Sequence, residues 1–167
     1  MRRLAPALLV VLVAGCGSDS GAKTTTVVQT QTVPHATKSP VDRTPKAPPK
    51  PTVVKKLTSF TSPTRNIGCY IDRTSVRCDI QKRDWKPPPK PRKCDLDWGQ
   101  GIGLSAGRKP SIICAGDTAL NRSRKLAYGT AIAAGVLRCD SRSTAMTCRD
   151  TETGRGFTLS RQIYKLF

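Results

Sequence analysis

The sequence has 167 residues and a formal net charge of +18, from 29 Lys and Arg against 11 Asp and Glu. Its only histidine, His35, lies in a Thr- and Pro-rich stretch, which argues against catalysts that need a fixed histidine base. A charge of this size and sign favours anionic polymers or lipid headgroups as partners, with plain solubility as the alternative explanation.

The first fifteen residues, 1–15, have the pattern of a signal peptide. Arg2 and Arg3 precede an apolar run that is too short to span a bilayer. The run ends in Val13-Ala14-Gly15-Cys16, which resembles the lipobox of bacterial lipoproteins. The resemblance implies that the chain is cut before Cys16 and that this cysteine carries acyl chains such as palmitate. The protein would then be anchored in the cell membrane and face away from the cytoplasm. A plain secretory signal is the alternative.

Residues 16–56 have the composition of a disordered tether. Thr, Pro, Lys and Ser dominate this range, and every aromatic residue lies beyond it, from Phe60 onward. Such a segment buries too little apolar surface to offset the entropy lost on ordering. We therefore expect the folded domain to span residues 57–167, which is long enough for one hydrophobic core.

The first half of this domain predicts strands. Residues 58–62 form a short strand candidate that ends before Pro63. Apolar and polar residues then nearly alternate over 66–71 and 76–80, with turn-forming residues between the two arms. This pattern predicts an antiparallel hairpin that places Cys69 and Cys78 on facing strands.

Residues 82–93 concentrate six cations beside Trp85 and three consecutive prolines. The prolines favour a stiff polyproline II backbone, and an aromatic ring among cations can stack on a ligand. The segment is our candidate contact loop, and its predicted binding residues are Trp85, Lys86, Lys90, Arg92 and Lys93. The alternative, which we prefer, is a rigid surface crossover in which Trp85 caps the core.

The next segment contains two motifs and meets the requirements of neither. Asp95 and Asp97 fit the start of a calcium-binding EF-hand loop, but Gly99 and Ala106 stand where ligands belong. Gly103-Leu-Ser-Ala-Gly107 matches the nucleophile elbow of serine hydrolases, which requires a histidine later in the chain. We therefore predict that residues 103–107 form a glycine-rich loop, without a metal or a cofactor.

The second half is predicted to consist of short strands at 111–114, 126–132, 135–139 and 157–159, with one helical turn after Thr118. Cys139 and Cys148 repeat the spacing of the first cysteine pair, which predicts a second hairpin. The expected fold is mainly β: a small antiparallel sheet or open barrel with cysteine-closed hairpins and little helix.

Export would place the six cysteines after Cys16 in an oxidising compartment, where an even number predicts three disulfides. Many pairings are possible, and we choose the pairs nearest in sequence, which are Cys69–Cys78, Cys94–Cys114 and Cys139–Cys148. A zinc site is the weaker alternative because the gaps between these cysteines are too long for a typical ligand pair.

Several short motifs together resemble an uncharacterised family of small secreted or lipid-anchored proteins of actinobacteria. They include Asn66-Ile-Gly-Cys69, Arg77-Cys-Asp79, Leu96-Asp-Trp-Gly99, Cys114-Ala-Gly-Asp-Thr118 and Gly156-Phe157 followed by Leu159-Ser-Arg161. The resemblance implies an envelope location and one compact cysteine-paired unit, and it supplies no catalytic residue.

Three functions remain after these exclusions. The first is a non-catalytic, basic binding domain that faces outside the cytoplasm and binds an anionic envelope component. The second is a protein-recognition module, such as an inhibitor or an accessory subunit. The third and weakest is a hydrolase that uses carboxylates alone. We do not expect nucleic acid as a partner.

Overall fold

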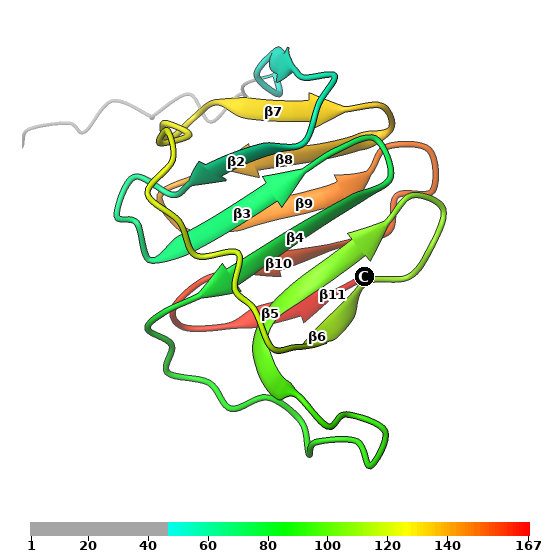
Figure 1. Ribbon diagram of the computed structural model, residues 1–167. Coiled ribbons are helices and arrows are strands. Elements are labelled where there is room, and N and C mark those ends of the chain that lie inside the picture. The colour runs from blue at the N-terminus through cyan, green and yellow to red at the C-terminus, as the bar shows by residue number, and fades with distance from the viewer. Residues whose placement is uncertain (1–46) are drawn as a thin grey trace, which may run out of the picture. The chain divides into compact units, whose positions relative to one another are not determined.

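The computed structural model describes residues 47–167, which form two β-sheets that pack face to face (Figure 1). The six-stranded sheet contains, in spatial order, β1 (Pro51–Val53), β7 (Ala131–Ala134), β8 (Leu137–Ser141), β9 (Met146–Asp150), β10 (Gly156–Leu159) and β11 (Tyr164–Leu166). The five-stranded sheet contains β2 (Thr58–Thr61), β3 (Ile67–Ile71), β4 (Ser75–Ile80), β5 (Asp97–Ser105) and β6 (Ser111–Ala115).

This architecture confirms the predicted mainly-β fold class. All strand pairs within the two sheets are antiparallel except β1 and β7, which run parallel. Both sheets keep open edges, so the fold is an open sandwich and not a closed barrel. Residues 47–167 contain no helix, and hence none there is long and apolar enough to cross a membrane.

The strand β1 lies in the range that the sequence analysis assigns to the tether. Pro51, Thr52 and Val53 pair with Ala131, Ile132 and Ala133 of β7. Arg138 fixes the segment further, because its Nη2 donates a hydrogen bond of 2.6 Å to the carbonyl oxygen of Pro49. The fold thus includes residues that precede Leu57. Residues 1–46, with Cys16, lie outside the described part.

The core between the sheets is built around two disulfides. Cys69–Cys78 links β3 to β4, and Cys139–Cys148 links β8 to β9, each across a directly opposed residue pair. All four cysteines are fully buried, and the Sγ atoms of Cys78 and Cys148 lie 3.8 Å apart. The third disulfide, Cys94–Cys114, lies outside this cluster. These are the three pairs that we predicted, and all six cysteines after Cys16 are used in them.

The structure corrects part of the prediction of a loop over 103–107, because residues 103–105 belong to a strand. Residues Asp97–Ser105 form β5, the longest strand, and glycines occur at alternate positions along it. Two of them are required by close neighbours. A Cβ atom at Gly101 would overlap Oδ1 of Asp79, and a Cβ atom at Gly103 would lie 2.7 Å from Cδ1 of Ile113. The glycines therefore leave space for side chains of the neighbouring strands and do not mark a loop.

Two further predictions in the second half are wrong. Residues 126–130 are not a strand, since β7 begins only at Ala131. The expected helical turn after Thr118 is also absent from this described segment. Instead, Oγ1 of Thr118 accepts a hydrogen bond from the backbone N–H of Leu120 at 3.0 Å, which forms a local turn.

Asp150 connects the turns at one end of the two sheets. Its Oδ2 accepts a hydrogen bond of 2.7 Å from the N–H of Gly107, which follows β5. Its Oδ1 accepts bonds from the N–H groups of Glu152 and Thr153 in the β9–β10 turn. The bond from Gly107, followed by that from Thr153, lowers the pKa of the Asp150 carboxyl below its ordinary value.

We expect Asp150→Asn to destabilise the fold by about 1–3 kcal/mol at neutral pH, because the charged acceptor is lost. A carboxyl whose pKa is lower in the folded state stabilises the fold above its unfolded pKa and stops doing so as the pH falls through the folded value. Wild-type stability should therefore fall below about pH 4, and the variant should show a smaller fall. Urea unfolding at a series of pH values checks this. The variant should retain part of the pH dependence of stability, because the pKa values of Asp72 and Asp117 are also lowered. An unchanged pH profile would contradict the role of Asp150.

Candidate functional site

Trp85 of the predicted contact loop is a packing residue in the structure. Its Nε1–H donates a hydrogen bond of 2.9 Å to the carbonyl oxygen of Ser160. Its ring centroid lies 4.6 Å from that of Tyr164 on β11, and the guanidinium of Arg83 lies 4.8 Å from the ring centroid. The ring is therefore partly buried and packs against the core, as in the alternative that we preferred from the sequence.

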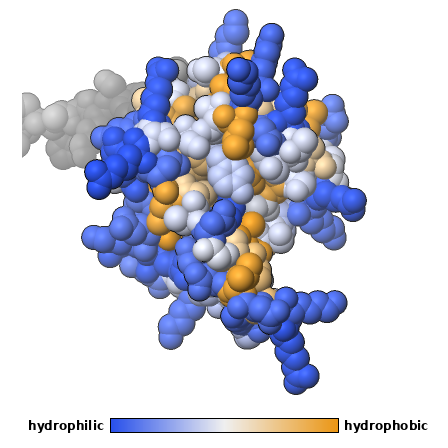
Figure 2. All heavy atoms as spheres, viewed as in Figure 1, coloured by the Kyte–Doolittle hydropathy of each residue, from blue (hydrophilic) through white to orange (hydrophobic). Residues whose placement is uncertain are grey.

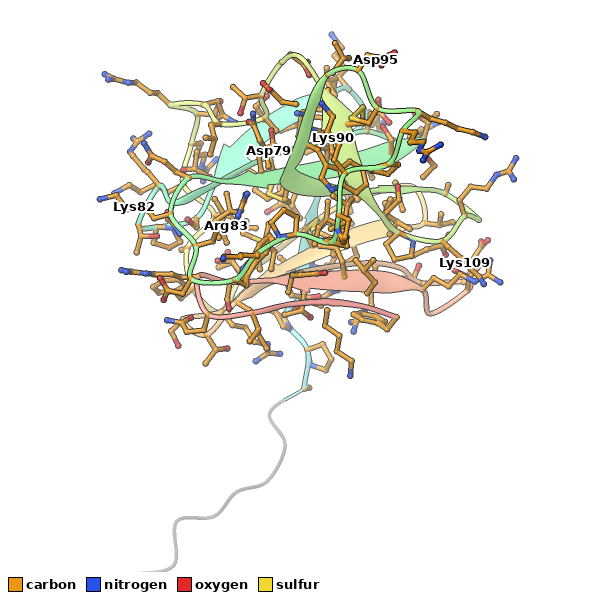
Figure 3. All side chains as sticks on the ribbon, turned by 90° about the horizontal axis from the view of Figure 1, so that it is seen from below. Asp79, Lys82, Arg83, Lys90, Asp95 and Lys109 are labelled. Carbon is orange, nitrogen blue, oxygen red and sulfur yellow. A yellow bond between two sulfur atoms is a disulfide. The ribbon has the colours of Figure 1, made fainter. Side chains whose placement is uncertain are left out.

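The rest of the contact loop is held by Trp98 of β5. The Nε1–H of Trp98 donates a 2.8 Å bond to the carbonyl oxygen of Pro88, and Gly99 lies directly against the ring of Pro87. The four cations predicted to bind, namely Lys86, Lys90, Arg92 and Lys93, are exposed on this loop. Lys90 lies apart from Lys82 and Arg83 (Figure 3). The structure therefore divides the basic segment between two places.

A hollow of about 410 Å³ opens at the end of the sandwich where β4 finishes. Four separate stretches and one loop residue form it: the β2–β3 connection, the residues after β4, the β8–β9 turn, the residues after β10, and Tyr128. The lining residues are Ser62, Thr64, Asn66, Ile67, Gln81, Lys82, Tyr128, Ser141, Arg142, Ser143, Thr144, Ala145, Met146, Ser160, Arg161 and Gln162. We call this hollow the end pocket.

Buried groups give the end pocket a fixed frame. Ile67 and Met146 belong to the apolar core and supply the nonpolar part of the lining. The hydroxyl of Ser62 accepts a bond from the N–H of Ile67, and that of Ser160 donates to the carbonyl oxygen of Ile163. Asn66 clamps the main chain of Lys82, since its Nδ2 donates to the carbonyl oxygen and its Oδ1 accepts from the N–H. The frame is therefore set before any ligand arrives.

Three cations surround this pocket, and none of the lining residues is acidic within the described part of the chain. Lys82 and Arg142 are exposed, with no ion pair among residues 47–167. Arg161 is held by Asp84, whose Oδ1 accepts from Nε at 3.1 Å. Hydroxyls, amides and cations together donate hydrogen bonds to oxygen anions, which is the chemistry that phosphate and carboxylate groups require.

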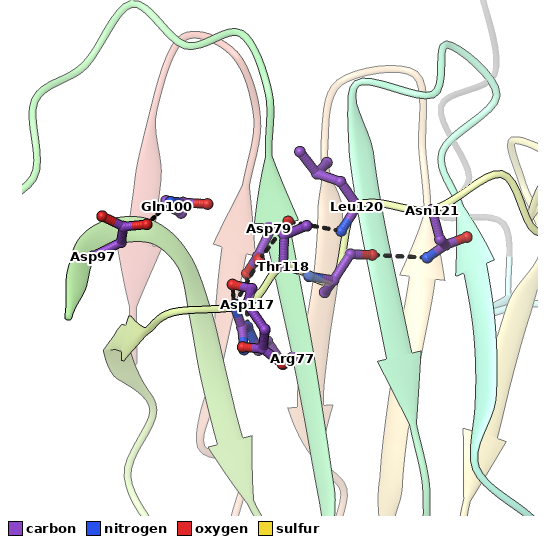
Figure 4. Close-up of polar contacts among 9 residues, drawn as sticks. Arg77, Asp79, Asp97, Gln100, Asp117, Thr118, Leu120 and Asn121 are labelled. Carbon is purple, nitrogen blue, oxygen red and sulfur yellow. Dashed lines mark hydrogen bonds and ion pairs between the residues drawn. The ribbon is translucent and has the colours of Figure 1, made fainter.

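Buried carboxylates of the described residues are engaged in structural contacts. Asp79 accepts two bonds from Arg77 and further bonds from Thr118 and the N–H of Ala119, while Arg77 also binds Asp117 (Figure 4). Burial alone would lower the pKa of Arg77, but the bonds to Asp79 and Asp117 raise it above its ordinary value. This network fixes the segment after β6 onto the outer face of β4. On the other sheet, Asp140 is paired with Arg138 at 2.6 Å.

Of the end-pocket residues, only Lys82 belonged to the basic segment for which the sequence predicted binding. Asn66, Ser160 and Arg161 occur in motifs of the family resemblance, but these motifs assigned them no binding role. The pocket was missed because its residues come from stretches up to about a hundred residues apart. The spacing of Cys139 and Cys148 could have indicated part of the pocket. Their disulfide joins β8 to β9 and so brings residues 141–146 together around one turn.

The fold and this site define a class: a disulfide-bridged open β-sandwich with a cation-rimmed polar pocket at one end. No curated protein and no solved structure matches the chain. The model of a family described as a family of unknown function (DUF6636) matches residues 47–167. The chain belongs to this family, whose extent coincides with the part of the chain that the structure describes.

We expect Trp85→Ala to lower the free energy of unfolding by about 2–4 kcal/mol, because the ring packs on Tyr164 and its N–H satisfies Ser160. Chemical denaturation of the oxidised protein measures the change. Lys86→Ala, at the exposed neighbouring position, should have an effect within about 0.5 kcal/mol. Equal stability of wild type and Trp85→Ala would show that the ring is dispensable for the fold.

Proposed function

We propose that this protein is a lipid-anchored envelope protein whose domain binds an anionic polymer of the cell envelope without catalysing a reaction. The observation that carries the proposal is the end pocket, whose lining combines three cations with hydroxyls and amides and contains no carboxylate among the described residues. An anionic group in this pocket meets hydrogen-bond donors and positive charge on several sides.

The electrostatics of the whole chain support the same proposal. The full sequence has a net charge of +18, and loss of Arg2 and Arg3 with residues 1–15 would leave a protein that is still strongly positive. Such a charge attracts polyanions over a distance set by the ionic strength. Figure 2 shows long hydrophilic side chains projecting around the face that the five-stranded sheet presents. Within the pocket, the bond from Arg161 to Asp84 reduces the side-chain entropy that binding must remove.

The anchor is part of the proposal and rests on the sequence. Residues 1–15 would direct export, Cys16 would carry the lipid, and the following Pro-rich residues would let the domain reach polymer beyond the membrane. This part of the chain lies outside the described residues.

The pocket prediction uses a matched pair of double variants. Lys82→Gln with Arg142→Gln removes two cations from the end pocket, whereas Arg108→Gln with Lys109→Gln removes the same charge from the β5–β6 turn. Lys109 lies on the opposite side of the molecule from Lys82 (Figure 3). The pocket variant should bind poly(glycerol phosphate) or polygalacturonate at least about tenfold more weakly, with a salt slope lower by about two. The turn variant should bind nearly as the wild type does.

Isothermal titration calorimetry at several salt concentrations measures both quantities, with uncharged dextran as the ligand control. Equal loss of affinity in the two double variants would show that binding depends on overall charge and not on the end pocket. A wild type that binds neither polymer would overturn the proposal.

Lipidation is tested in cells of a bacterium that processes lipoproteins. Metabolic labelling with an alkynyl fatty acid should mark the wild type, and Cys16→Ala should abolish the label because the acceptor thiol is gone. A Cys69→Ala variant serves as the control for a lost cysteine elsewhere and should remain labelled. Persistent label on Cys16→Ala would refute the anchor.

A protein-recognition role is the second candidate, and a separate observation favours it. β11 is the outer strand of the six-stranded sheet, and the apolar side chains of Ile163, Leu166 and Phe167 are 59%, 38% and 44% exposed there. An open strand edge with apolar groups can pair with an extended segment of another protein. Variants at Ile163 should then affect partner capture and leave polymer binding unchanged.

A further inference from the structure

A second hollow, of about 600 Å³, adjoins the end pocket. Its lining residues are Ile80, Gln81, Lys82, Arg83, Asp84, Gln100, Leu120 and Arg161. Gln81, Lys82 and Arg161 line both hollows. The two hollows are therefore neighbours that share one wall, which we call the shared ridge.

Cations are placed along the whole length of this double hollow. Arg142 lines only the end pocket, Lys82 and Arg161 stand on the shared ridge, and Arg83 lines only the second hollow. The single carboxylate among these lining residues, Asp84, accepts a bond from Arg161 and so is partly neutralised. Positive charge thus continues from one hollow to the next.

The far wall of the second hollow is fixed by the buried ionic network. Leu120 follows directly on the segment that Arg77 and Asp79 hold, where Asp79 accepts the N–H of Ala119 at 2.8 Å. The segment around Ala119 and Leu120 lies on the outer face of β4, and it stays in place without a ligand, as does Gln100 of β5. On the ridge, Asn66 fixes the main chain of Lys82. Part of the wall of each hollow is therefore fixed before a ligand binds.

We infer that the two hollows form one continuous site for a linear polyanion, with consecutive anionic units of a single chain in the end pocket and in the second hollow. This inference rests on the proposed function and specifies its ligand as a chain with repeated charges. A single anion fills one hollow, whereas a linked pair fills both, and the second contact then forms at a high effective concentration. Affinity should consequently rise steeply with chain length.

The test compares glycerol 1-phosphate with a poly(glycerol phosphate) hexamer on the full chain carrying Cys16→Ala, which removes the acylated position. Site-resolved NMR titration follows the amides of 142–145 for the end pocket and those of Gln100 and Leu120 for the second hollow. The monomer should shift both sets, with a stoichiometry of two per chain. The hexamer should shift both sets together, with a stoichiometry of one and an affinity at least about a hundredfold higher.

Variants assign each hollow. Arg142→Gln and Arg83→Gln should each weaken hexamer binding about fivefold or more, while each weakens the monomer at only one hollow. Because Arg83 also contacts the Trp85 ring, Gln100→Glu provides a second test of that hollow without removing the contact. Thr144→Glu is the matching variant for the end pocket, and Arg108→Gln is the control variant far from both hollows.

The outcomes separate the two proposals. Hexamer binding that depends on Arg142 and Thr144, but not on Arg83 or Gln100, would overturn the continuous site and leave the proposed function in place. Two hexamers per chain would also overturn it. Failure of monomer and hexamer to bind the wild type would overturn both proposals for this class of ligand.

Discussion

The contact between two disulfides in the centre of the sandwich is the constraint on which the rest of the structure depends. Cys69–Cys78 and Cys139–Cys148 each lock the register of one hairpin, and the 3.8 Å approach of Cys78 to Cys148 packs the hairpins against each other. A one-residue slip would turn every core side chain outward, so covalent register is a strong constraint in strands this short. The pocket-forming turns lie at the ends of these locked strands and inherit their positions.

Each buried carboxylate in the described residues has hydrogen-bond partners. Asp79, Asp140 and Asp150 are buried and accept hydrogen bonds from arginines or from turn N–H groups, so they stabilise the fold only because each has partners. Cations such as Lys82, Arg142 and Lys90 are exposed. Two of the buried carboxylates are paired with arginines that are themselves largely buried, so these internal charges balance and the exposed lysines and arginines set the positive charge of the surface.

The sequence predicted those features that depend on local pattern. Alternation around Cys69 and Cys78 gave the first hairpin, and equal cysteine spacing gave the second. It failed at the end of β5, where Gly103 suggested a loop although this glycine leaves space for Ile113 of the neighbouring strand β6. This contact joins two neighbouring strands, and it leaves no periodic pattern in the sequence of either strand. The end pocket was missed for the same reason, since Asn66, Arg142 and Arg161 meet only after both sheets have formed.

The short strand β1 determines how mechanical load would enter the domain. It is joined to β7 in parallel over three residue pairs, with Val54 donating a further bond to Ala133 and Arg138 holding Pro49. A pull directed along this strand stretches its hydrogen bonds simultaneously, in shear, whereas a pull across it opens them one after another. The orientation of the incoming chain therefore sets the force that the domain withstands before β1 detaches, and the disulfide-locked strands beyond it would remain intact after that event.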